Sequence, residues 1–271
     1  MRAPPARPGR LVLLGHPVTH SLSPIFQNAA LKAAGIPLEY VAIDVSPADL
    51  PRMLRQMEDV NAAGNATIPH KVAIYNKCTV ATPLAERVGA VNTFWFEEGK
   101  LQGDNTDVGG FDSAARALLG GDPAGARVVV LGAGGAAAAV LAAISTWSDA
   151  EAALVSRTFE RATDLARRFP DVARAERKVE RALKTATLVV NATPVGQHDD
   201  DHPLDLSLVP KGAAVLDLVY RRGGTEWVRA ARARGLRAAD GLPMLLEQGA
   251  LAFQRWFGVE PDREAMRLSL L

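Results

Sequence analysis

The sequence has little of several features that would point to other classes of protein. Cys78 is the only cysteine among 271 residues, which excludes an internal disulfide and a cysteine-based zinc cluster and fits a reducing compartment. Basic and acidic residues number 31 and 30, so the net charge of +1 offers no strong field for nucleic acid or an anionic membrane. No apolar run approaches the roughly 20 residues of a membrane helix. We therefore expect a cytoplasmic enzyme that acts on a small molecule.

Residues 1–10 are rich in arginine and proline, and the apolar run that follows ends at Gly15. This run is too short for the core of a secretory signal sequence with its cleavage site. We therefore interpret residues 1–10 as a loose tail.

Strand-like and helix-like segments alternate along the sequence, which predicts a mostly parallel sheet covered by helices. In the first part the expected strands are 11–14, 40–45 and 64–67, and the expected helices are 24–34, 48–57 and 71–77. Residues 91–96 and 100–103 flank Glu97-Glu98-Gly99 and predict a β-hairpin, because glycine supplies the positive φ of such turns. In the second part the expected strands are 127–131, 152–155, 188–191 and 213–218, and the expected helices are 136–144, 159–169, 242–257 and 262–270.

These patterns predict an α/β protein of two domains. Residues 1–107 and 241–271 would form an N-terminal α/β substrate-binding and catalytic domain, to which the C-terminal helices return. Residues 108–240 would form a Rossmann-like, doubly wound domain for the cofactor. The segments 103–110 and 240–241 would serve as the hinge, with the ligand in a cleft between the domains.

A glycine turn begins the second domain. Gly132, Gly134 and Ala137 satisfy the pattern G-x-G-x-x-G/A directly after an apolar strand and before an alanine-rich helix. The glycines allow the backbone to approach a pyrophosphate at the helix N-terminus, where N–H groups favour an anion. We therefore expect a dinucleotide to contact Gly132, Ala133, Gly134, Gly135 and Ala136.

The segment after the next strand distinguishes NADP from NAD. NAD-binding domains carry an acid about 20 residues past the glycines, where it binds the ribose 2′-hydroxyl. This sequence instead has Ser156, Arg157 and Thr158, with Arg161 one helical turn on, and guanidinium groups with hydroxyls suit a 2′-phosphate. NADP is the expected cofactor. The alternative is that both arginines are merely solvated residues at a helix start.

Two polar segments lie upstream of the glycine turn. Residues 65–71, Asn-Ala-Thr-Ile-Pro-His-Lys, end in Lys71, and residues 103–107, Gly-Asp-Asn-Thr-Asp, end in Asp107. A lysine and an aspartate on two loops facing a nicotinamide could move the proton that accompanies hydride transfer to or from an alcohol. The residues by themselves leave open that Lys71 is a surface cation at a helix start.

The cluster His198-Asp199-Asp200-Asp201-His202 could in principle ligate a metal through imidazole and carboxylate groups. Five consecutive residues cannot all converge on one ion, and so acidic a run is usually exposed. We interpret the cluster as a solvated loop and expect no metal site.

An ordered set of motifs along essentially the whole chain resembles the shikimate dehydrogenase family. The motifs are residues 21–24 (Ser-Leu-Ser-Pro), 65–71, 89–93 (Gly-Ala-Val-Asn-Thr), 104–107, the Gly132 turn, 191–194 (Asn-Ala-Thr-Pro) and 241–244 (Gly-Leu-Pro-Met). The sequence departs from the family pattern at Ala66, where valine is usual, and at Ser156, where asparagine usually precedes the Arg-Thr pair.

The resemblance implies reversible NADPH-dependent reduction of 3-dehydroshikimate to shikimate, in aromatic amino acid biosynthesis, by a monomer or homodimer. Lys71 and Asp107 would be the catalytic pair, without a decision on which is the formal acid. The residues expected to hold the substrate are Ser21, Ser23, Thr67, Asn92, Tyr220 and Gln248. Those expected near the cofactor, besides the glycine turn and the Ser156 segment, are Asn191, Ala192, Thr193, Leu218 and Gly241.

Two alternatives remain open from the sequence. One is a quinate or broad quinate/shikimate dehydrogenase with NAD use, against which Ser23 and the Ser156-Arg157-Thr158 triplet argue. The other is a non-catalytic NADP-binding regulatory homologue, which loss of Lys71 or Asp107 would have indicated, and both residues are present.

Overall fold

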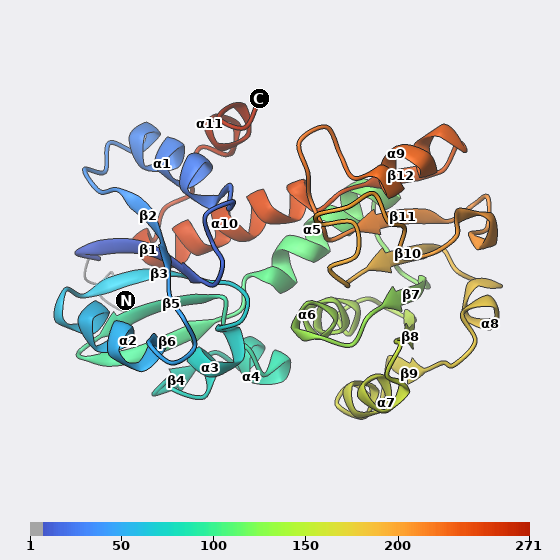
Figure 1. Ribbon diagram of the computed structural model, residues 1–271, viewed down its shortest axis with the longest axis horizontal. Coiled ribbons are helices and arrows are strands. Elements are labelled where there is room, and N and C mark those ends of the chain that lie inside the picture. Colours follow the sequence, from blue (N-terminus) through green and yellow to red (C-terminus); the bar gives the residue numbers. More distant parts are fainter. Residues whose placement is uncertain (1–7) are drawn as a thin grey trace. The chain divides into compact units, whose positions relative to one another are not determined.

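The structure is a computed structural model that describes residues 8–271, so the expected tail lies outside the described residues except for its last three positions. The chain divides into two compact units: a first unit, up to residue 110 together with 245–271, and a second unit, 111–244. Both divisions fall inside helices, α5 (Asp107–Leu119) and α10 (Leu242–Phe257) (Figure 1). The expected domain boundaries, after residues 107 and 240, stay a prediction.

The first unit contains a six-stranded mixed sheet in the order β2-β1-β3-β5-β6-β4. Its strands are β1 (Arg10–Gly15), β2 (Tyr40–Asp44), β3 (Ala62–Ala66), β4 (Val80–Ala81), β5 (Thr93–Glu97) and β6 (Lys100–Asp104). Strand β1 runs parallel to β2 and β3, whereas β5 runs antiparallel to β3 and β6. The β5–β6 pair confirms the expected hairpin, and its turn has positive φ at Glu98 and Gly99.

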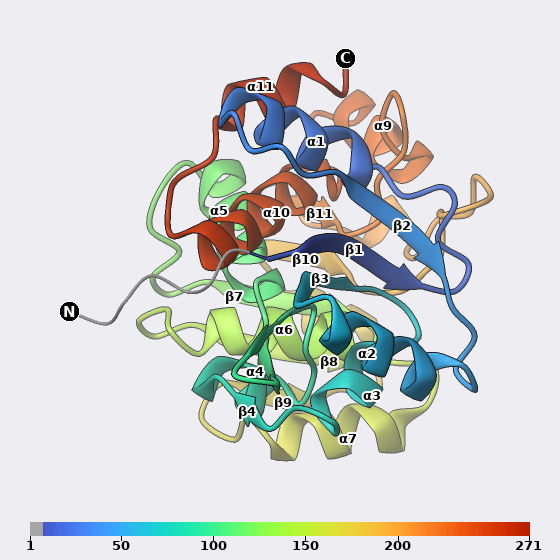
Figure 2. The same ribbon diagram turned by 90° about the vertical axis from the view of Figure 1, so that its left-hand side faces the viewer.

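Helices cover both faces of this sheet. They are α1 (Ser23–Ala33), α2 (Leu50–Asp59), α3 (Lys71–Tyr75), α4 (Pro83–Val88), α11 (Arg263–Leu268) and the C-terminal part of α10. Because successive strand residues point to opposite faces, Leu11 and Leu13 pack in a core with α1, α10 and α11. Val12 and Leu14 pack in another core with α2, α3 and α4. Figure 2 shows α1 and α11 on one side of β1 and β2, with α2 and α3 on the other.

The second unit contains a six-stranded, entirely parallel sheet in the order β12-β11-β10-β7-β8-β9. Its strands are β7 (Arg127–Leu131), β8 (Glu151–Val155), β9 (Ala173–Ala175), β10 (Leu188–Asn191), β11 (Ala214–Asp217) and β12 (Arg237–Ala239). The order reverses at β7, the first of these strands in sequence, so the sheet grows outward in both directions from it. This doubly wound order confirms the Rossmann-like expectation.

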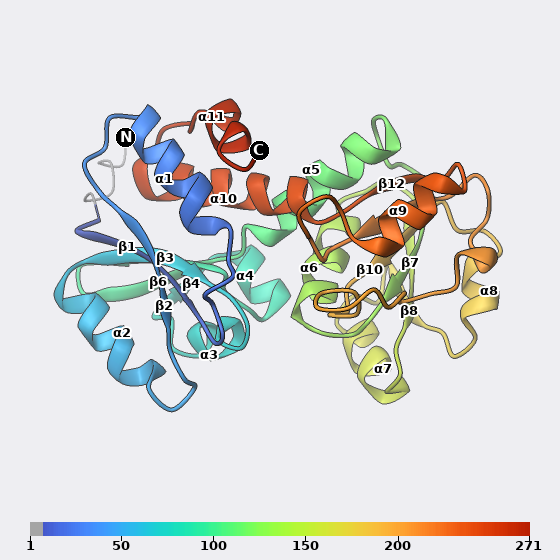
Figure 3. The ribbon, with the colours of Figure 1, turned by 45° about the horizontal axis from the view of Figure 1, so that its top comes forward.

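Helices also cover both faces of the second sheet. They are α6 (Gly135–Ile144), α7 (Phe159–Arg167), α8 (Val179–Leu183) and α9 (Glu226–Ala233). Val129 and Val215 pack in a core with Leu183 of α8 and Trp227 of α9. Figure 3 shows α6 and α7 on one side of β7 and β8 and α8 on the other. In the part of the chain that the structure describes, no helix is both long and apolar enough to cross a membrane.

The segment 103–110, expected to be a hinge, is mostly regular structure: it includes the last two residues of β6 and the first turn of α5. Two glycines at 109 and 110 weaken the helical pattern of the sequence. A Cβ atom at Gly109 would lie 2.6 Å from Cδ1 of Leu251, so the absence of a side chain allows α10 to approach α5. Helix α5 was therefore not predicted, because its glycines serve a contact that the sequence does not reveal.

Gly64 lies in the middle of β3, between β1 and β5. A Cβ atom at this position would come within 2.1 Å of the carbonyl oxygen of Val12 in β1. Neither backbone can withdraw without breaking the strand pairing, so any side chain at this position is expected to strain the first sheet.

We therefore expect Gly64→Ala to lower the stability of the first unit by about 1–3 kcal/mol, the usual cost of overpacking, or more. Differential scanning calorimetry would show a lower unfolding midpoint. The control is Gly212→Ala, where a Cβ meets no atom within 4 Å, and it should leave the midpoint nearly unchanged. Equal midpoints for the two variants would contradict the close approach.

Candidate active site

Lys71 is the first residue of α3, and backbone hydrogen bonds hold the turn before it. The N–H of His70 donates to the carbonyl of Thr67 at 2.8 Å, and the N–H of Thr67 donates to the carbonyl of Leu14 in β1 at 2.9 Å. The carbonyl of Lys71 itself accepts from the N–H of Val91 at 2.9 Å. The lysine is therefore fixed at its backbone, at the end of the polar segment 65–71 and at the start of the helix that we expected from residue 71.

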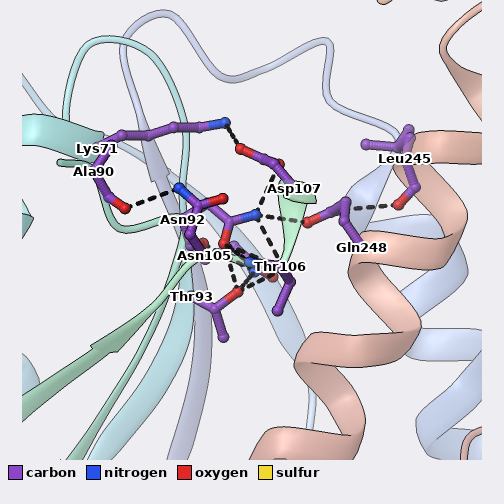
Figure 4. A network of polar contacts seen from close by, with 10 residues as sticks. Lys71, Ala90, Asn92, Thr93, Asn105, Thr106, Asp107, Leu245 and Gln248 are labelled. Atoms are coloured by element: carbon purple, nitrogen blue, oxygen red, sulfur yellow. Dashed lines mark hydrogen bonds and ion pairs between the residues drawn. The ribbon is translucent and has the colours of Figure 1, made fainter. Parts of the chain in front are cut away.

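Asp107 is the first residue of α5, where a carboxylate is favoured by the helix dipole. Its Oδ2 accepts from Nζ of Lys71 at 2.6 Å, and the two side chains are 10% and 26% exposed. Its Oδ1 accepts from Nδ2 of Asn92 at 2.8 Å. Both carboxylate oxygens thus have a donor, and the head group has one orientation (Figure 4).

Asn92 precedes β5 and connects Asp107 with α10. Its Nδ2 donates to Oε1 of Gln248 at 3.2 Å and to Oγ1 of Thr106 at 3.0 Å. Gln248 in turn donates through Nε2 to the carbonyl of Leu245 at 2.8 Å. Four of the predicted residues, Lys71, Asn92, Asp107 and Gln248, therefore form one connected cluster in the first unit.

Ser21, Ser23 and Thr67 lie after neighbouring parallel strands of the first unit. The two serines follow β1, and Thr67 directly follows β3, whose Ala66 pairs with Leu14. Oγ of Ser21 accepts the N–H of Ser23 at 3.2 Å. Within residues 8–271 the hydroxyls of Ser23 and Thr67 have no hydrogen-bond partner, so they are free to bind a ligand.

Tyr220 differs from the other residues predicted to bind substrate because it belongs to the second unit. It follows β11 and is half-buried. Its role in binding the substrate stays a prediction.

The glycine turn connects β7 to α6 with the expected strand, turn and helix order. Gly132 has φ of +114°, which favours glycine, and a Cβ there would lie 2.8 Å from the carbonyl oxygen of Ala192. A Cβ at Gly134 or Gly135 would meet no atom within 4 Å, so this side of the turn is open. The turn therefore leaves room for an anion at the N-terminus of α6.

The Ser156 segment follows β8, the parallel neighbour of β7, so it lies at the same edge of the sheet as the glycine turn. Oγ of Ser156 accepts the N–H of Thr158 at 3.3 Å. Arg157 and Arg161 are exposed, and neither forms an ion pair with a residue in the described part of the chain. Two unneutralised guanidinium groups at this position suit a phosphate group.

Asn191 ends β10 and is completely buried. Its Oδ1 accepts from the hydroxyl of Thr193 at 2.6 Å, and its Nδ2 donates to Oδ1 of Asp217 at 2.8 Å. The N–H of Leu218 donates to the carbonyl of Asn191 at 2.9 Å, and a Cβ at Gly241 would lie 2.3 Å from the carbonyl oxygen of Leu218. The residues predicted here therefore form one packed group, in which Asn191 shapes the turn.

Sequence reasoning missed three supporting residues, Asp217, Thr93 and Thr106. Burial raises the pKa of Asp217, although hydrogen bonds from Thr225, the Val219 N–H and Asn191 oppose this shift. Thr93 and Thr106 lie inside two of the quoted motifs but had received no role. Their position next to Asn92 and Asp107 was the only available signal.

The acidic loop is held by side chains and contains no metal cluster. Oδ1 of Asp199 accepts the N–H groups of Gly196 and Asp201, and Arg221 donates to the carbonyl of Asp199 at 2.7 Å and to Asp200 at 2.9 Å. Among residues 8–271, no three His, Cys, Asp or Glu side chains are arranged so that they could hold a metal ion together.

Three family models match consecutive parts of the chain. They are the shikimate dehydrogenase substrate binding domain at residues 13–94, shikimate / quinate 5-dehydrogenase at 113–198, and the shikimate 5'-dehydrogenase C-terminal domain at 241–271. The first match contains Lys71 and Asn92, and the second contains the glycine turn and the Ser156 segment.

Relatives and solved structures match over nearly the whole length. A shikimate dehydrogenase (NADP(+)) of Methanopyrus kandleri is 40% identical over 96% of this chain and 93% of its own length. Another, of Moorella thermoacetica, is 43% identical over 94% of this chain and 90% of its own length. The crystal structure of the Aquifex aeolicus shikimate dehydrogenase has a TM-score of 0.90 at 35% identity, covering 96% of this chain and 97% of that one. The crystal structure of the Thermus thermophilus shikimate 5-dehydrogenase in complex with NADP(H) and shikimate has a TM-score of 0.88 at 41% identity. It covers 96% of this chain and 98% of that one. The chain belongs to the shikimate dehydrogenase family.

Proposed function

We propose that this protein catalyses the reversible, NADP-dependent interconversion of 3-dehydroshikimate and shikimate. The observation that carries the proposal is the connected cluster of Lys71, Asp107, Asn92 and Gln248 in the unit that contains the substrate-binding match. Family membership supports it, because relatives at about 40% identity over nearly the full length are NADP-dependent shikimate dehydrogenases. As a biosynthetic enzyme it would act in the direction of shikimate, on the route to aromatic amino acids.

The chemistry of the reaction requires a hydride and a proton. Bound NADPH supplies the hydride to the ketone carbon, and the proton for the forming alkoxide has to come from a side chain or water. Lys71 carries such protons on Nζ, next to Asp107. Lys71 would protonate or polarise the alkoxide oxygen, and Asp107 would accept a hydrogen bond from the substrate hydroxyl while it orients Lys71.

The substrate is a small polyhydroxy acid, which needs many short hydrogen bonds. The free hydroxyls of Ser23 and Thr67, together with Ser21, suit its carboxylate. Asn92 and Gln248 offer amide groups to its ring hydroxyls, and Tyr220 completes the set as we expected from the sequence. A substrate analogue that lacks one hydroxyl would leave a buried polar group of the site unpaired, so the site should discriminate strongly against such an analogue.

The second unit would hold the cofactor through residues that differ in chemistry. The turn from Gly132 to Ala136 suits the pyrophosphate, whereas Ser156, Thr158 and the two arginines 157 and 161 suit the adenosine 2′-phosphate. The packed group of Asn191–Thr193, Leu218 and Gly241 offers backbone groups to the nicotinamide half. The NADP-dependent relative from Methanopyrus kandleri and the Thermus thermophilus structure in complex with NADP(H) support this assignment.

We expect Lys71→Ala to lower kcat for shikimate oxidation by roughly 10²–10⁴-fold, the usual contribution of a positioned acid or base. Asp107→Asn should lower it as well, because the amide cannot accept from both Lys71 and Asn92. The measurement is NADP reduction at mildly alkaline pH, with shikimate and separately with quinate. Lys77→Ala is the control, since Lys77 is an exposed lysine of the same unit.

Full turnover by Lys71→Ala would refute the assigned role of the lysine. Faster turnover with quinate or NAD would instead favour the quinate/shikimate dehydrogenase alternative. NADPH binding by the unmodified protein without turnover of either substrate would favour the non-catalytic regulatory alternative.

We expect Arg157→Ala and Arg161→Ala each to raise KM for NADP by about 10- to 100-fold, because each removes a hydrogen bond between charged groups. KM for NAD should barely change, since NAD lacks the 2′-phosphate. Arg167→Ala is the matched control, because Arg167 is an exposed arginine on α7 that pairs with Asp164. Equal effects on NADP and NAD would contradict a 2′-phosphate contact.

A further inference from the structure

Behind the Lys71–Asp107 pair lies a series of hydrogen bonds that reaches deep into the core of the first unit. The hydroxyl of Tyr40 donates to Oδ1 of Asn65 at 2.8 Å. Nδ2 of Asn65 donates to Oγ1 of Thr93 at 3.0 Å. Tyr40 is 1% exposed and Thr93 is 0% exposed, so neither can touch a substrate. The hydroxyl groups of both residues are nevertheless connected to the cluster around Asp107.

The donors in this series all point in one direction. Thr93 accepts from Asn65, so its single proton is available for Oδ1 of Asn92 at 3.0 Å or Oγ1 of Thr106 at 2.9 Å. Oδ1 of Asn92 also accepts the backbone N–H of Thr106 at 2.7 Å, which identifies this end of the amide as the oxygen. The amino end of Asn92 must therefore face Oδ1 of Asp107. Figure 4 shows Thr93 and Thr106 beside Asn92 on this path.

The series begins at the hydroxyl of Tyr40, which burial keeps protonated and therefore able to donate. The ring of Tyr40 packs against Trp256, with centroids 6.1 Å apart, and burial raises the pKa of Tyr40 well above its ordinary value. The phenol therefore keeps its proton. Nδ2 of Asn65 also donates to the backbone carbonyl of Asn92 at 3.0 Å, and because a carbonyl can only accept, Oδ1 of Asn65 is the end that faces the phenol and accepts from it. Asn65 must then use its amino group toward Thr93, because its oxygen is occupied.

We propose that Thr93 and Tyr40 are positioning residues, which set the orientation of the Asn92 amide and thereby of the Asp107 carboxylate. Tyr40 acts through Asn65 and Thr93, whereas the hydroxyl of Thr93 lies directly against Oδ1 of Asn92. The two residues make no contact with Asp107 themselves. Without the Thr93 hydroxyl, Asn92 Oδ1 loses a donor and Asn65 Nδ2 loses an acceptor. The amide of Asn92 is then less restricted, and an error of about 1 Å at a reacting group is enough to slow catalysis strongly.

The test of this proposal uses nearly isosteric substitutions. Thr93→Val and Tyr40→Phe should each lower kcat/KM for shikimate about tenfold, as expected for the loss of one buried hydrogen bond. KM for NADP should stay unchanged. Thr93→Ser should restore activity, because serine keeps the hydroxyl. The kcat/KM of the double variant should be only slightly lower than that of the more impaired single variant, since both changes interrupt the same series.

Asn28→Ala is the matched control for a purely structural effect. Asn28 binds the backbone of Tyr40, donating to its carbonyl at 3.0 Å and accepting from its N–H at 2.8 Å. Its loss should lower the unfolding temperature and leave kcat/KM unchanged, because the phenol still reaches Asn65. Unchanged kcat/KM in Thr93→Val and Tyr40→Phe would overturn the proposal, as would an equal loss of kcat/KM in Asn28→Ala.

The kinetic part of this proposal rests on the proposed function, so a second readout is independent of turnover. The side-chain amide of Asn92 gives its own pair of ¹⁵N–¹H NMR signals in the protein without substrate. Thr93→Val should shift these signals and speed their exchange with water, whereas Thr93→Ser should not. If the unmodified protein shows no shikimate turnover, the proposed function fails while this shift still supports the positioning role. Unchanged Asn92 signals in Thr93→Val would overturn it.

Discussion

The carboxylate of Asp107 is the group on which the first unit's site depends. A carboxylate that is mostly removed from water needs donors on both oxygens, because an unpaired buried charge is costly. Lys71 at the start of α3 supplies one donor, and Asn92 before β5 supplies the other. Gln248 of α10 joins through Asn92, although 156 positions separate them. Satisfying one charge therefore brings together segments that are distant in the sequence, and the same contacts orient the groups proposed for catalysis.

The second unit follows a different constraint, the geometry of a parallel sheet. The carboxyl ends of β7, β8 and β10 lie at one edge, so the glycine turn, the Ser156 segment and the Asn191 turn all begin there. Asn191 and Asp217 stabilise this edge from inside through their mutual hydrogen bond. The exposed arginines after β8, Arg157 and Arg161, carry charges that no described acid neutralises, whereas many other arginines on the surface form ion pairs.

The sequence predicted the elements whose signal is local. The apolar period of β7 and the alanine-rich pattern of α6 are long enough to recognise, and the turn at Glu98-Gly99 needs positive φ. Strands β4 and β9 escaped prediction because two or three residues carry no period, and they exist only through their pairing with β6 and β8. Helices α8 and α9 were also missed. Trp227 of α9 is buried against the second sheet, and that burial is a tertiary contact.

The sequence by itself determined the α/β class, the doubly wound cofactor sheet and the family, because motif order, glycine requirements and apolar periods are encoded locally. It also singled out Lys71 and Asp107 as candidates. Only the tertiary structure decided that Asp107 begins a helix, that Asn92 connects Asp107 to Gln248, and that Thr93 links the hydrogen bond of Tyr40 to Asn92. The physical reason is that hydrogen-bond partners are chosen by distance and direction in the folded chain, and neither quantity is contained in the spacing of residues.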